Sequence, residues 1–227
     1  MSKTTLVFDL DGTIVHSVPD LANAVNHVLV SLGKEPLSVA ETQSMIGNGM
    51  PKLLERGFDA RSMEVSEDEF RQHFTVFRDF YTENCCVDTV AYPGAIEMLE
   101  KVRADGYLTA ICTNKLETIT KVIMDQMGLT RLFDGVVGDE PPRPRKPQAD
   151  PVWLAIERAG GCRDNSIMIG DSPADIGAGK AALLPTIAVS YGYTNVPPAE
   201  LGADILIDQL SEVSEAVRKV QDTILAK

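Results

Sequence analysis

The chain lacks the long apolar segment that a membrane-spanning helix needs. No uninterrupted apolar stretch approaches the ~20 residues that cross a bilayer. The first residues also show no basic segment followed by an apolar run, which is the pattern of a secretion signal. We therefore expect a cytoplasmic protein with no membrane partner.

Cysteine and histidine are also scarce. The four cysteines show no C-x-x-C metal-binding spacing, and Cys85 and Cys86 are adjacent, which disfavours an ordinary disulfide between them. The three histidines are scattered through one region and are never paired at the spacing of metal ligands. We therefore expect reduced thiols and solvated or helix-surface histidines, not a disulfide framework or a metal site built on Cys and His.

Positive charge is in short supply. The chain has 21 Lys and Arg against 33 Asp and Glu, a formal net charge of -12. Nucleic acids are bound through clustered Lys and Arg, so we expect no nucleic-acid partner. An anionic substrate would depend on local cations. The 227 residues, 44% hydrophobic and 24% charged, are typical of an ordered globular protein and can form a core domain plus an insertion.

Strand-like and helix-like segments alternate through most of the chain. We expect strands over 6–10, 107–112, 133–137, 166–169, 186–189 and 204–207, and helices over 93–105, 116–127, 151–159, 173–182 and 210–225. This alternation predicts an α/β fold with a Rossmann-like parallel sheet core flanked by helices. Such sheets bind ligands at the carboxyl ends of their strands, near the point where the strand order reverses.

The first part of the chain interrupts this alternation. One amphipathic helix ends near Gly33, further helical patterns cover 42–46, 51–56 and 67–81, and no strand lies between them. We expect an all-helical cap domain over 16–85, inserted after the first strand of a core domain made of 1–15 and 86–227. The loop over 46–50 is either a mobile specificity element facing the site or a simple connection between helices.

Two carboxylates follow the first strand. Asp9 and Asp11 lie two residues apart, so they begin on one face of the strand, where like charges disfavour each other unless a cation or a shared proton intervenes. A hard cation such as Mg2+ would offset this repulsion and leave coordination positions for a phosphate. The alternative is a hairpin turn at Asp11-Gly12 with no chemical role.

Two later segments carry groups suited to binding a phosphoryl oxygen. Thr113 and Asn114 follow the second strand and offer neutral donors, although the same residues could simply cap the next helix. Lys146 lies in a proline-stiffened loop after the third strand and would supply a compact positive charge. The alternative there is a solvated basic loop, and we expect Arg143 and Arg145 to lie at the surface.

The fourth strand also delivers acidic residues. Asp171 comes directly after it, and Asp175 lies on the first turn of the next helix. Taken alone, Asp175 could simply interact favourably with the dipole at the N-terminus of that helix. The position of Asp171 at the sheet edge favours a metal ligand.

Together the four segments resemble the haloacid dehalogenase-like hydrolase superfamily. Its pattern runs Asp-x-Asp-Gly-Thr, hydrophobic-Thr-Asn, Lys-Pro and Gly-Asp-Ser-x-x-Asp, and the resemblance covers essentially the whole chain. Within it, the chain is similar to phosphoglycolate phosphatases through the helical cap, Ile-Gly-Asn-Gly at 46–49 and Tyr-Gly-Tyr at 191–193. One departure is Gln-Ala-Asp at 148–150, where the family commonly has His or Asp followed by Pro, and it leaves the exact substrate open.

The resemblance implies a role for each acidic residue. Asp9 would be the nucleophile that takes the phosphoryl group, and Asp11 the acid that protonates the leaving alkoxide and then the base that activates water. Dehalogenases of the superfamily lack the second Asp, so its presence favours phosphate chemistry. Mg2+ would be held by the Asp9 side chain, the Asp11 main-chain carbonyl and Asp171, with Asp175 in support.

The resemblance also implies the phosphate-binding groups and the substrate class. Thr113 and Asn114 would hold a phosphoryl oxygen, and Lys146 would offset charge on Asp9 and the substrate. We therefore expect a Mg2+-dependent phosphomonoester hydrolase that acts through an aspartyl-phosphate on a small phosphorylated metabolite, with 2-phosphoglycolate favoured. The alternatives are a sugar phosphomutase of the same superfamily and a non-catalytic phosphometabolite-binding protein. The sequence gives no indication of the oligomeric state.

Overall fold

The computed structural model describes residues 3–47 and 49–225, with the side chains of the last helix described up to residue 222. The chain divides into two compact units. One contains the described residues up to Val15 and from Ala91 onward, and the other is His16–Val90. In the part of the chain that is described, no helix is both long and apolar enough to cross a membrane.

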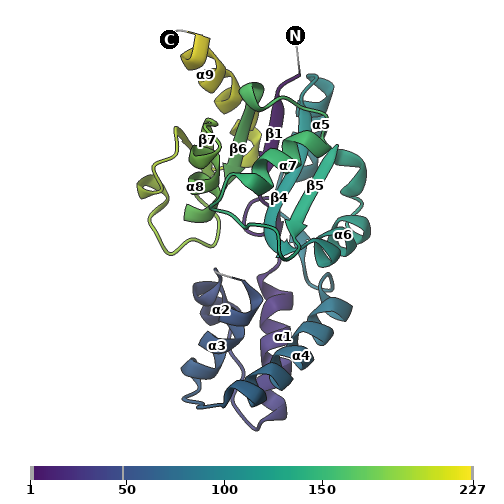
Figure 1. Cartoon of the computed structure of the whole chain (residues 1–227), viewed down its shortest axis with the longest axis vertical. Helices are drawn as coiled ribbons and strands as arrows, with labels where there is room; N and C mark the ends of the chain where they lie inside the picture. Colours follow the sequence, from purple (N-terminus) through teal and green to yellow (C-terminus); the bar gives the residue numbers. More distant parts are fainter. Residues whose placement is uncertain (1–2, 48, 226–227) are drawn as a thin grey trace. The chain divides into compact units, whose positions relative to one another are not determined.

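The first unit is built on a six-stranded sheet. Its strands are β1 (Thr5–Phe8), β4 (Leu108–Leu116), β5 (Gly135–Asp139), β6 (Ser166–Gly170), β7 (Thr186–Val189) and β8 (Ile205–Ile207). The order is β5-β4-β1-β6-β7-β8, and neighbouring strands pair in parallel (Figure 1). The chain fills one side of β1 with β4 and β5 before crossing to β6, so the strand order reverses at β1. The predicted fold class is confirmed.

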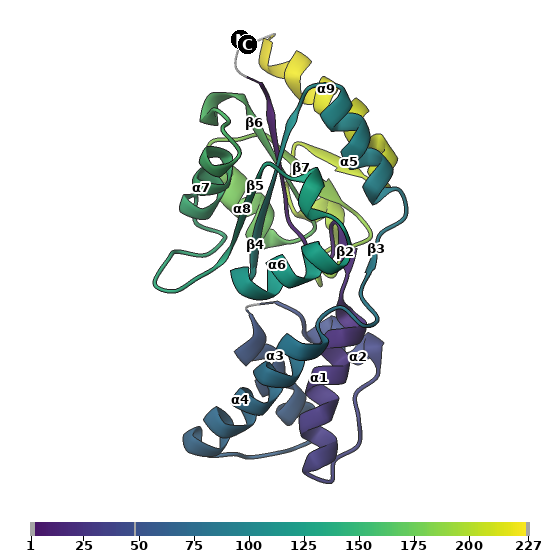
Figure 2. The ribbon, with the colours of Figure 1, turned by 90° about the vertical axis from the view of Figure 1, so that its right-hand side faces the viewer.

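Helices cover both faces of this sheet. Leu6 and Phe8 belong to one hydrophobic cluster and Val7 to the other, because successive side chains of a strand point to opposite faces. The helices of this unit are α5 (Ala95–Ala104), α6 (Glu117–Gln126), α7 (Asp150–Arg158), α8 (Pro173–Ala181) and α9 (Val213–Leu225). Figure 2 shows α5 and α9 on one side of the sheet and α7 and α8 on the other. Short 3-10 turns lie at Thr130–Leu132, Arg163–Asn165, Pro198–Glu200 and Leu210–Glu212.

Strand β4 differs from its predicted extent. It continues to Leu116 instead of ending at Cys112, because its pairing with β5 shifts register after Cys112 and resumes at Leu116 opposite Asp139. Thr113, Asn114 and the residue after them therefore lie on an irregular strand segment, not on a loop.

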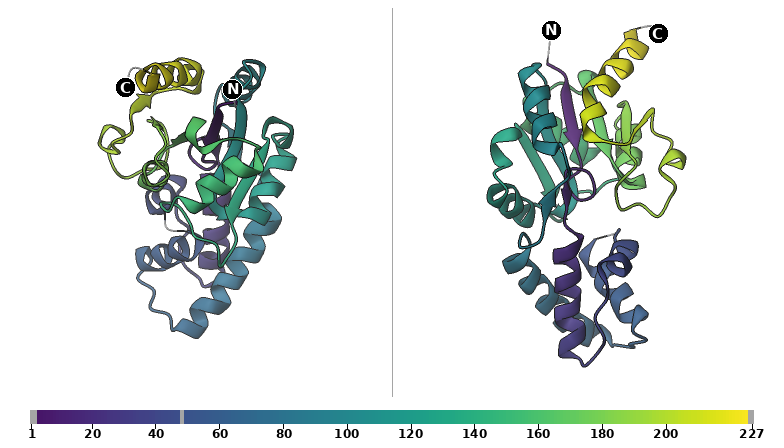
Figure 3. Two further views of the ribbon diagram at one scale, coloured as in Figure 1. Left: turned by 45° about the horizontal axis from the view of Figure 1, so that its top comes forward. Right: turned by 180° about the vertical axis from the view of Figure 1, so that it is seen from behind.

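The second unit is the helical insertion after the first strand. It contains α1 (Val18–Ser31), α2 (Val39–Met45), α3 (Met50–Ala60) and α4 (Glu67–Asn84). Ser38 and Ser66 begin α2 and α4 with capping boxes. Helix α1 packs along α4 (Figure 3). The two-residue strands β2 (Val15–His16) and β3 (Val90–Ala91) pair where the chain passes between the units. The predicted loop element at 46–50 includes Asn48, which lies outside the described residues.

A buried carboxylate on α1 explains why this unit extends to Val90. Asp20, 1% exposed, accepts hydrogen bonds from the backbone N–H groups of Val87, Asp88 and Thr89 and from the Thr89 hydroxyl, at 2.7 to 3.2 Å. Four donors from one segment converge on a single side chain. They fix the residues after α4 to the first helix of the unit.

Candidate active site at the carboxyl edge of the sheet

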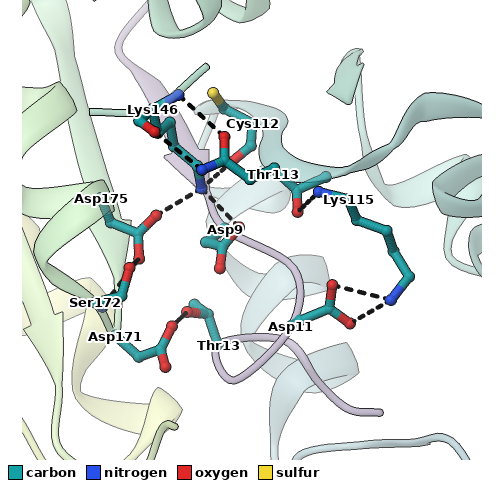
Figure 4. A network of polar contacts seen from close by, with 11 residues as sticks. Asp9, Asp11, Thr13, Cys112, Thr113, Lys115, Lys146, Asp171, Ser172 and Asp175 are labelled. Carbon is teal, nitrogen blue, oxygen red and sulfur yellow. Dashed lines mark hydrogen bonds and ion pairs between the residues drawn. The ribbon is translucent and has the colours of Figure 1, made fainter. Parts of the chain in front are cut away.

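The predicted site residues come from neighbouring strands of the core sheet. Asp9 follows β1, Thr113 lies on β4, and Asp171 follows β6, on the other side of β1. The backbone N–H of Asp9 continues the ladder by donating to the carbonyl of Ile169 at 2.9 Å. Because β1 is flanked by β4 and β6, the parallel strands deliver these side chains to one edge at the point where strand order reverses (Figure 4).

The segment after Asp9 is a compact turn. Leu10 O accepts from the N–H groups of Thr13, Ile14 and Val15, and Gly12 takes a φ of +88°, which only glycine adopts at no steric cost. A Cβ on Gly12 would also lie 2.5 Å from Asp171 Oδ2. The hairpin alternative for Asp11-Gly12 is wrong, because the partners of β1 are the parallel strands β4 and β6.

Lys146 lies at the centre of the buried charges. Its Nζ donates to Asp9 Oδ1 at 2.7 Å, to Asp175 Oδ1 at 2.6 Å and to the carbonyl of Cys112 at 2.6 Å. Burial alone would lower the pKa of Lys146, but the charges of Asp175 and Asp9 outweigh it and raise the pKa above its ordinary value, so the lysine stays charged. All three of its N–H donors are used by protein oxygens. Lys146 therefore offers a phosphate its charge and no unused donor.

The amide of Asn114 fixes the backbone that carries Lys146. Its Nδ2 donates to Lys146 O and its Oδ1 accepts from Lys146 N, each at 3.0 Å. Thr113 is buried, and its Oγ1 accepts from the N–H of Lys115 at 3.2 Å. Helix α6 takes Leu116 as its N-cap residue, with no side-chain cap bond. The helix-capping alternative for Thr113 and Asn114 is therefore wrong, and the structure shows Asn114 positioning Lys146.

Three carboxylates gather beside Lys146. Asp9, Asp171 and Asp175 each place one oxygen within 4.8 Å of the others, and all three are buried. The oxygens of Asp175 are already in use, since Oδ1 accepts from Lys146 and Oδ2 accepts from the N–H of Ser172 at 3.0 Å and its hydroxyl at 2.6 Å. The bonds to Ser172 form the capping box that begins α8. Asp175 therefore holds Lys146 and the start of this helix in place and has little capacity left for a metal ion.

Asp171 and Asp9 retain capacity for a further ligand. Among the described residues, Asp171 accepts from the Thr13 hydroxyl at 3.3 Å and from the N–H of Tyr193 at 2.7 Å, and from no other group. Asp9 Oδ1 accepts from Lys146, whereas Oδ2 accepts from none of the residues that the structure describes. Gly170 and Gly192 allow this crowding, because a Cβ on either would collide with Asp175 or Asp171.

The electrostatics of the three carboxylates fit a bound divalent cation. Burial, followed by the charge of Asp175, raises the pKa of Asp9 to about 7 even though Lys146 opposes the shift. Burial and the charges of Asp175 and Asp9 likewise raise the pKa of Asp171. One lysine for three buried acids leaves an excess of negative charge, and carboxylate oxygen is the donor that hard divalent cations prefer. The residues therefore fit a hard divalent cation.

The side chain of Asp11 lies apart from this group. Its two oxygens accept from Lys115 Nζ at 2.9 and 3.1 Å, and Figure 4 shows its carboxylate turned toward Lys115 and away from Asp171. The Lys115 side chain is only 5% exposed. Sequence reasoning missed Lys115, although it directly follows Thr113-Asn114. The one available signal is the position of Lys115 at the end of a strand, directly after two predicted site residues.

Three further residues make contacts that the sequence does not predict. Thr13 ends the Asp-x-Asp-Gly-Thr motif and Tyr193 ends Tyr-Gly-Tyr, yet no spacing indicates that both hydrogen-bond to Asp171. The sequence predicts Arg143 at the surface, but it is half-buried and donates to Glu117 Oε2 at 3.1 Å and to Gly138 O at 3.2 Å. A buried carboxylate at the start of α6 draws it inward. Arg145 is exposed, as expected.

Comparison with known proteins agrees with this geometry. The profile of the haloacid dehalogenase-like hydrolases matches residues 6–189. The chain is 35% identical to the phosphoglycolate phosphatase of Agrobacterium fabrum over 93% of this chain and 91% of that protein. It is 37% identical to the phosphoglycolate phosphatase of Psychrobacter arcticus over 85% of this chain and 86% of that protein. A crystal structure described as a predicted phosphoglycolate phosphatase from Haemophilus somnus superposes with a TM-score of 0.87 at 31% identity, covering 95% of this chain and 98% of that one. The chain belongs to the haloacid dehalogenase-like hydrolase family.

Proposed function

We propose that the protein is a Mg2+-dependent phosphomonoester hydrolase acting on 2-phosphoglycolate. The observation that carries this proposal is Asp9, a buried carboxylate with one oxygen on Lys146 and the other without a hydrogen bond in the described structure, next to Asp171. A nucleophile needs that arrangement, because one oxygen is fixed and the other can attack. Relatives named phosphoglycolate phosphatase that match most of the chain support the choice of substrate.

The first half-reaction transfers the phosphoryl group to the protein. Asp9 Oδ2 forms a bond to phosphorus as the bond between phosphorus and the ester oxygen breaks. The leaving oxygen takes a proton from the Asp11 carboxyl group. The products are an aspartyl-phosphate, the free alcohol and an Asp11 carboxylate.

The second half-reaction regenerates the enzyme. Asp11 takes a proton from a water molecule whose oxygen attacks phosphorus, the bond to Asp9 breaks, and inorganic phosphate leaves. Asp9, Asp171 and the main-chain carbonyl of Asp11 would hold Mg2+, which when bound supplies charge neutralisation to the phosphoryl group. Asp175 and Lys146 keep Asp9 in place throughout.

Neutral donors remain for the phosphoryl oxygens. The N–H of Leu10 donates to no oxygen of the described residues, while the carbonyl of Leu10 closes the turn after Asp9. Within the described structure, the Thr113 hydroxyl accepts one hydrogen bond and donates none, so its proton stays available. Leu10 follows β1 and Thr113 lies on the irregular last part of the neighbouring β4, at the sheet edge where backbone N–H groups favour anions. Asn114 contributes by holding Lys146, and its second amide hydrogen donates to no oxygen of the described residues.

Two assignments accompany this function as proposals. Residues His16–Val90 would form the cap that provides much of the substrate specificity, and the enzyme would act in the cytoplasm on a small metabolite. A cap assignment predicts that changes confined to the helical unit alter KM and substrate ranking more than the phosphoryl chemistry. Steady-state kinetics of such variants on several phosphate esters would test it.

Release of inorganic phosphate tests the function. We expect wild-type protein with Mg2+ to hydrolyse 2-phosphoglycolate faster than glucose 1-phosphate or a nucleotide, and Asp9→Asn to lose at least about 10³-fold in kcat with an unchanged fold. Asp105→Asn, an exposed acid on the core unit, is the matched control and should keep full activity. Substantial residual activity of Asp9→Asn contradicts the mechanism. An isomerised sugar phosphate would favour the mutase alternative, and no hydrolysis with any divalent cation would favour a binding protein.

A further inference from the structure

Two lysines hold the two aspartates of the first motif separately. Lys146 contacts Asp9 at 2.7 Å, and Lys115, from the irregular end of β4, contacts both oxygens of Asp11 at 2.9 and 3.1 Å. The side chains of Lys115 and Asp11 are 5% and 17% exposed. The aspartates are two residues apart in sequence, yet each has its own cation. This division of charge separates the two carboxylates in the space beside the sheet (Figure 4).

The Lys115–Asp11 pair differs from the surface ion pairs of the same unit. Lys101 and Asp105 meet at 2.8 Å with side chains 58% and 45% exposed, so water competes for both partners. Lys115 is removed from water, which costs free energy unless the carboxylate and further hydrogen bonds replace the lost hydration. The backbone N–H of Lys115 donates to Thr113 Oγ1, so the backbone from which the lysine side chain extends is also fixed.

A proton donor must keep its oxygen within about 2.6–3.2 Å of the group that receives the proton. A short Asp side chain on a turn can rotate about χ1 among three staggered positions unless contacts select one. The two hydrogen bonds from Lys115 hold the Asp11 carboxylate in the position that the structure shows. Asp175 does the same for Lys146 and hence for Asp9, so both reacting carboxylates are fixed through a neighbour.

We propose that Lys115 is the positioning residue for proton transfer, holding the Asp11 carboxyl group where it can serve the leaving-group oxygen. The inference rests on the proposed function, because it assigns Asp11 the proton transfer of that reaction. One Asp11 oxygen stays on Lys115 while the other delivers its proton to the ester oxygen as the bond to phosphorus breaks. Lys115 donates no proton itself and forms no bond to phosphorus.

Leaving groups distinguish this role from a structural one. The alkoxide released from 2-phosphoglycolate needs a proton as it leaves, whereas p-nitrophenolate is a stable anion and needs none. We expect Lys115→Met to lower kcat/KM for 2-phosphoglycolate by about 10²-fold or more, the usual size of general acid catalysis, and to change kcat/KM for p-nitrophenyl phosphate by less than about 5-fold. Lys115→Arg, which keeps a charged donor, should recover most of the loss, and Lys101→Met is the matched control for removal of a lysine.

Equal losses on both esters, or a Lys115→Met enzyme that behaves like wild type on both, would overturn the proposal. If the Met variant does not fold, the ratio of the two kcat/KM values in Lys115→Gln decides in the same way. If wild-type protein hydrolyses neither ester, the proposed function itself fails. Crystal structures of the wild type and of a Lys115 variant then judge the positioning alone, since an Asp11 carboxylate in one unchanged orientation in both would show that Lys115 does not select it.

Discussion

Asp20 in the helical unit and Asp171 in the core unit are both almost completely buried, at 1% and 2% exposed, yet their surroundings differ. Asp20 accepts from three backbone N–H groups and a hydroxyl, all from the segment after α4. Asp171 accepts from one N–H and a longer hydroxyl contact, and its nearest charged neighbours include two more carboxylates. The same side chain is fully satisfied in one unit and crowded by like charge in the other.

This difference separates a structural acid from a functional one. A carboxylate surrounded by donors stabilises the fold by itself, whereas a buried carboxylate beside like charges raises the free energy of the folded protein until a cation binds.

Glu117 is a third case, because its negative charge is balanced by cationic side chains. It accepts from Lys121, Arg143 and Arg158 and from the N–H of Gly138. Substitutions of these three acids should therefore have different effects.

Asp171→Asn should have the largest effect, and on function. We expect kcat to fall by at least about 10³-fold, as for other residues that act as a catalytic unit. Removing one of the crowded charges should leave the metal-free protein at least as stable as wild type. The stabilisation that Mg2+ gives the wild type, measured as a rise in Tm, should disappear. A full Mg2+-dependent rise in the variant would place the cation elsewhere.

Asp20→Ala should have its main effect on folding stability. Four donors lose their acceptor, and buried donors left without partners cost free energy, so we expect a loss of about 2–4 kcal/mol in the free energy of unfolding. Urea denaturation measures this loss. The Mg2+-dependent rise in Tm should survive, which makes this variant the reciprocal control for Asp171→Asn. Loss of metal response with little loss of stability would remove the distinction between the two acids.

Glu117→Gln should reduce folding stability by an amount that depends on pH. Burial alone would raise the pKa of Glu117, but hydrogen bonds from Lys121, Arg143 and Arg158 outweigh it and lower the pKa to about 2. A carboxyl whose pKa is lower in the folded state stabilises it above the unfolded pKa near 4.5 and loses that contribution as pH falls toward 2. At pH 7 we expect the variant to be about 1–2 kcal/mol less stable than wild type.

The difference between Glu117→Gln and wild type should shrink as pH is lowered from about 4.5 toward 2, as urea denaturation at several pH values would show. Asp9 should act in the opposite direction in metal-free protein, because its pKa is raised to about 7 and its ionisation destabilises the fold as pH rises toward that value. If the difference in unfolding free energy between Glu117→Gln and wild type did not change with pH, the negative charge of Glu117 would not be the source of its stabilising effect.

Much of the core could be predicted because its signals are local. Strands such as Leu6–Phe8 are apolar on both faces, which is typical of a parallel sheet covered by helices, and the alternation with helices gives the topology class. The extension of β4 to Leu116 could not be predicted, since it depends on a register shift against β5. Local propensity does not indicate where a ladder resumes after an irregularity.

The acidic site residues could be predicted best where they directly follow a strand. Asp9 and Asp171 directly follow β1 and β6, and Thr113 lies on the irregular last part of β4, so the parallel strands bring all three to one edge. The contact of Lys115 with Asp11 spans 104 residues, and the three contacts of Lys146 come from three different segments. Such pairings are set by packing and by the cost of burying charge, and no spacing along the chain encodes them.

Lys121→Met should have the smallest effect and would sharpen the account of Glu117. Lys121 is four residues away on the same helix, its side chain is 60% exposed, and it contacts Oε1 alone at 2.8 Å. Exposed pairs at this spacing contribute little, so we expect a loss below about 0.5 kcal/mol. Arg143 and Arg158 share Oε2 in the more buried part of the cluster and should still satisfy Glu117. If urea denaturation showed Lys121→Met to cost as much as Glu117→Gln, the exposed lysine and not the two arginines would stabilise this acid, and burial would no longer distinguish Glu117 from a surface ion pair.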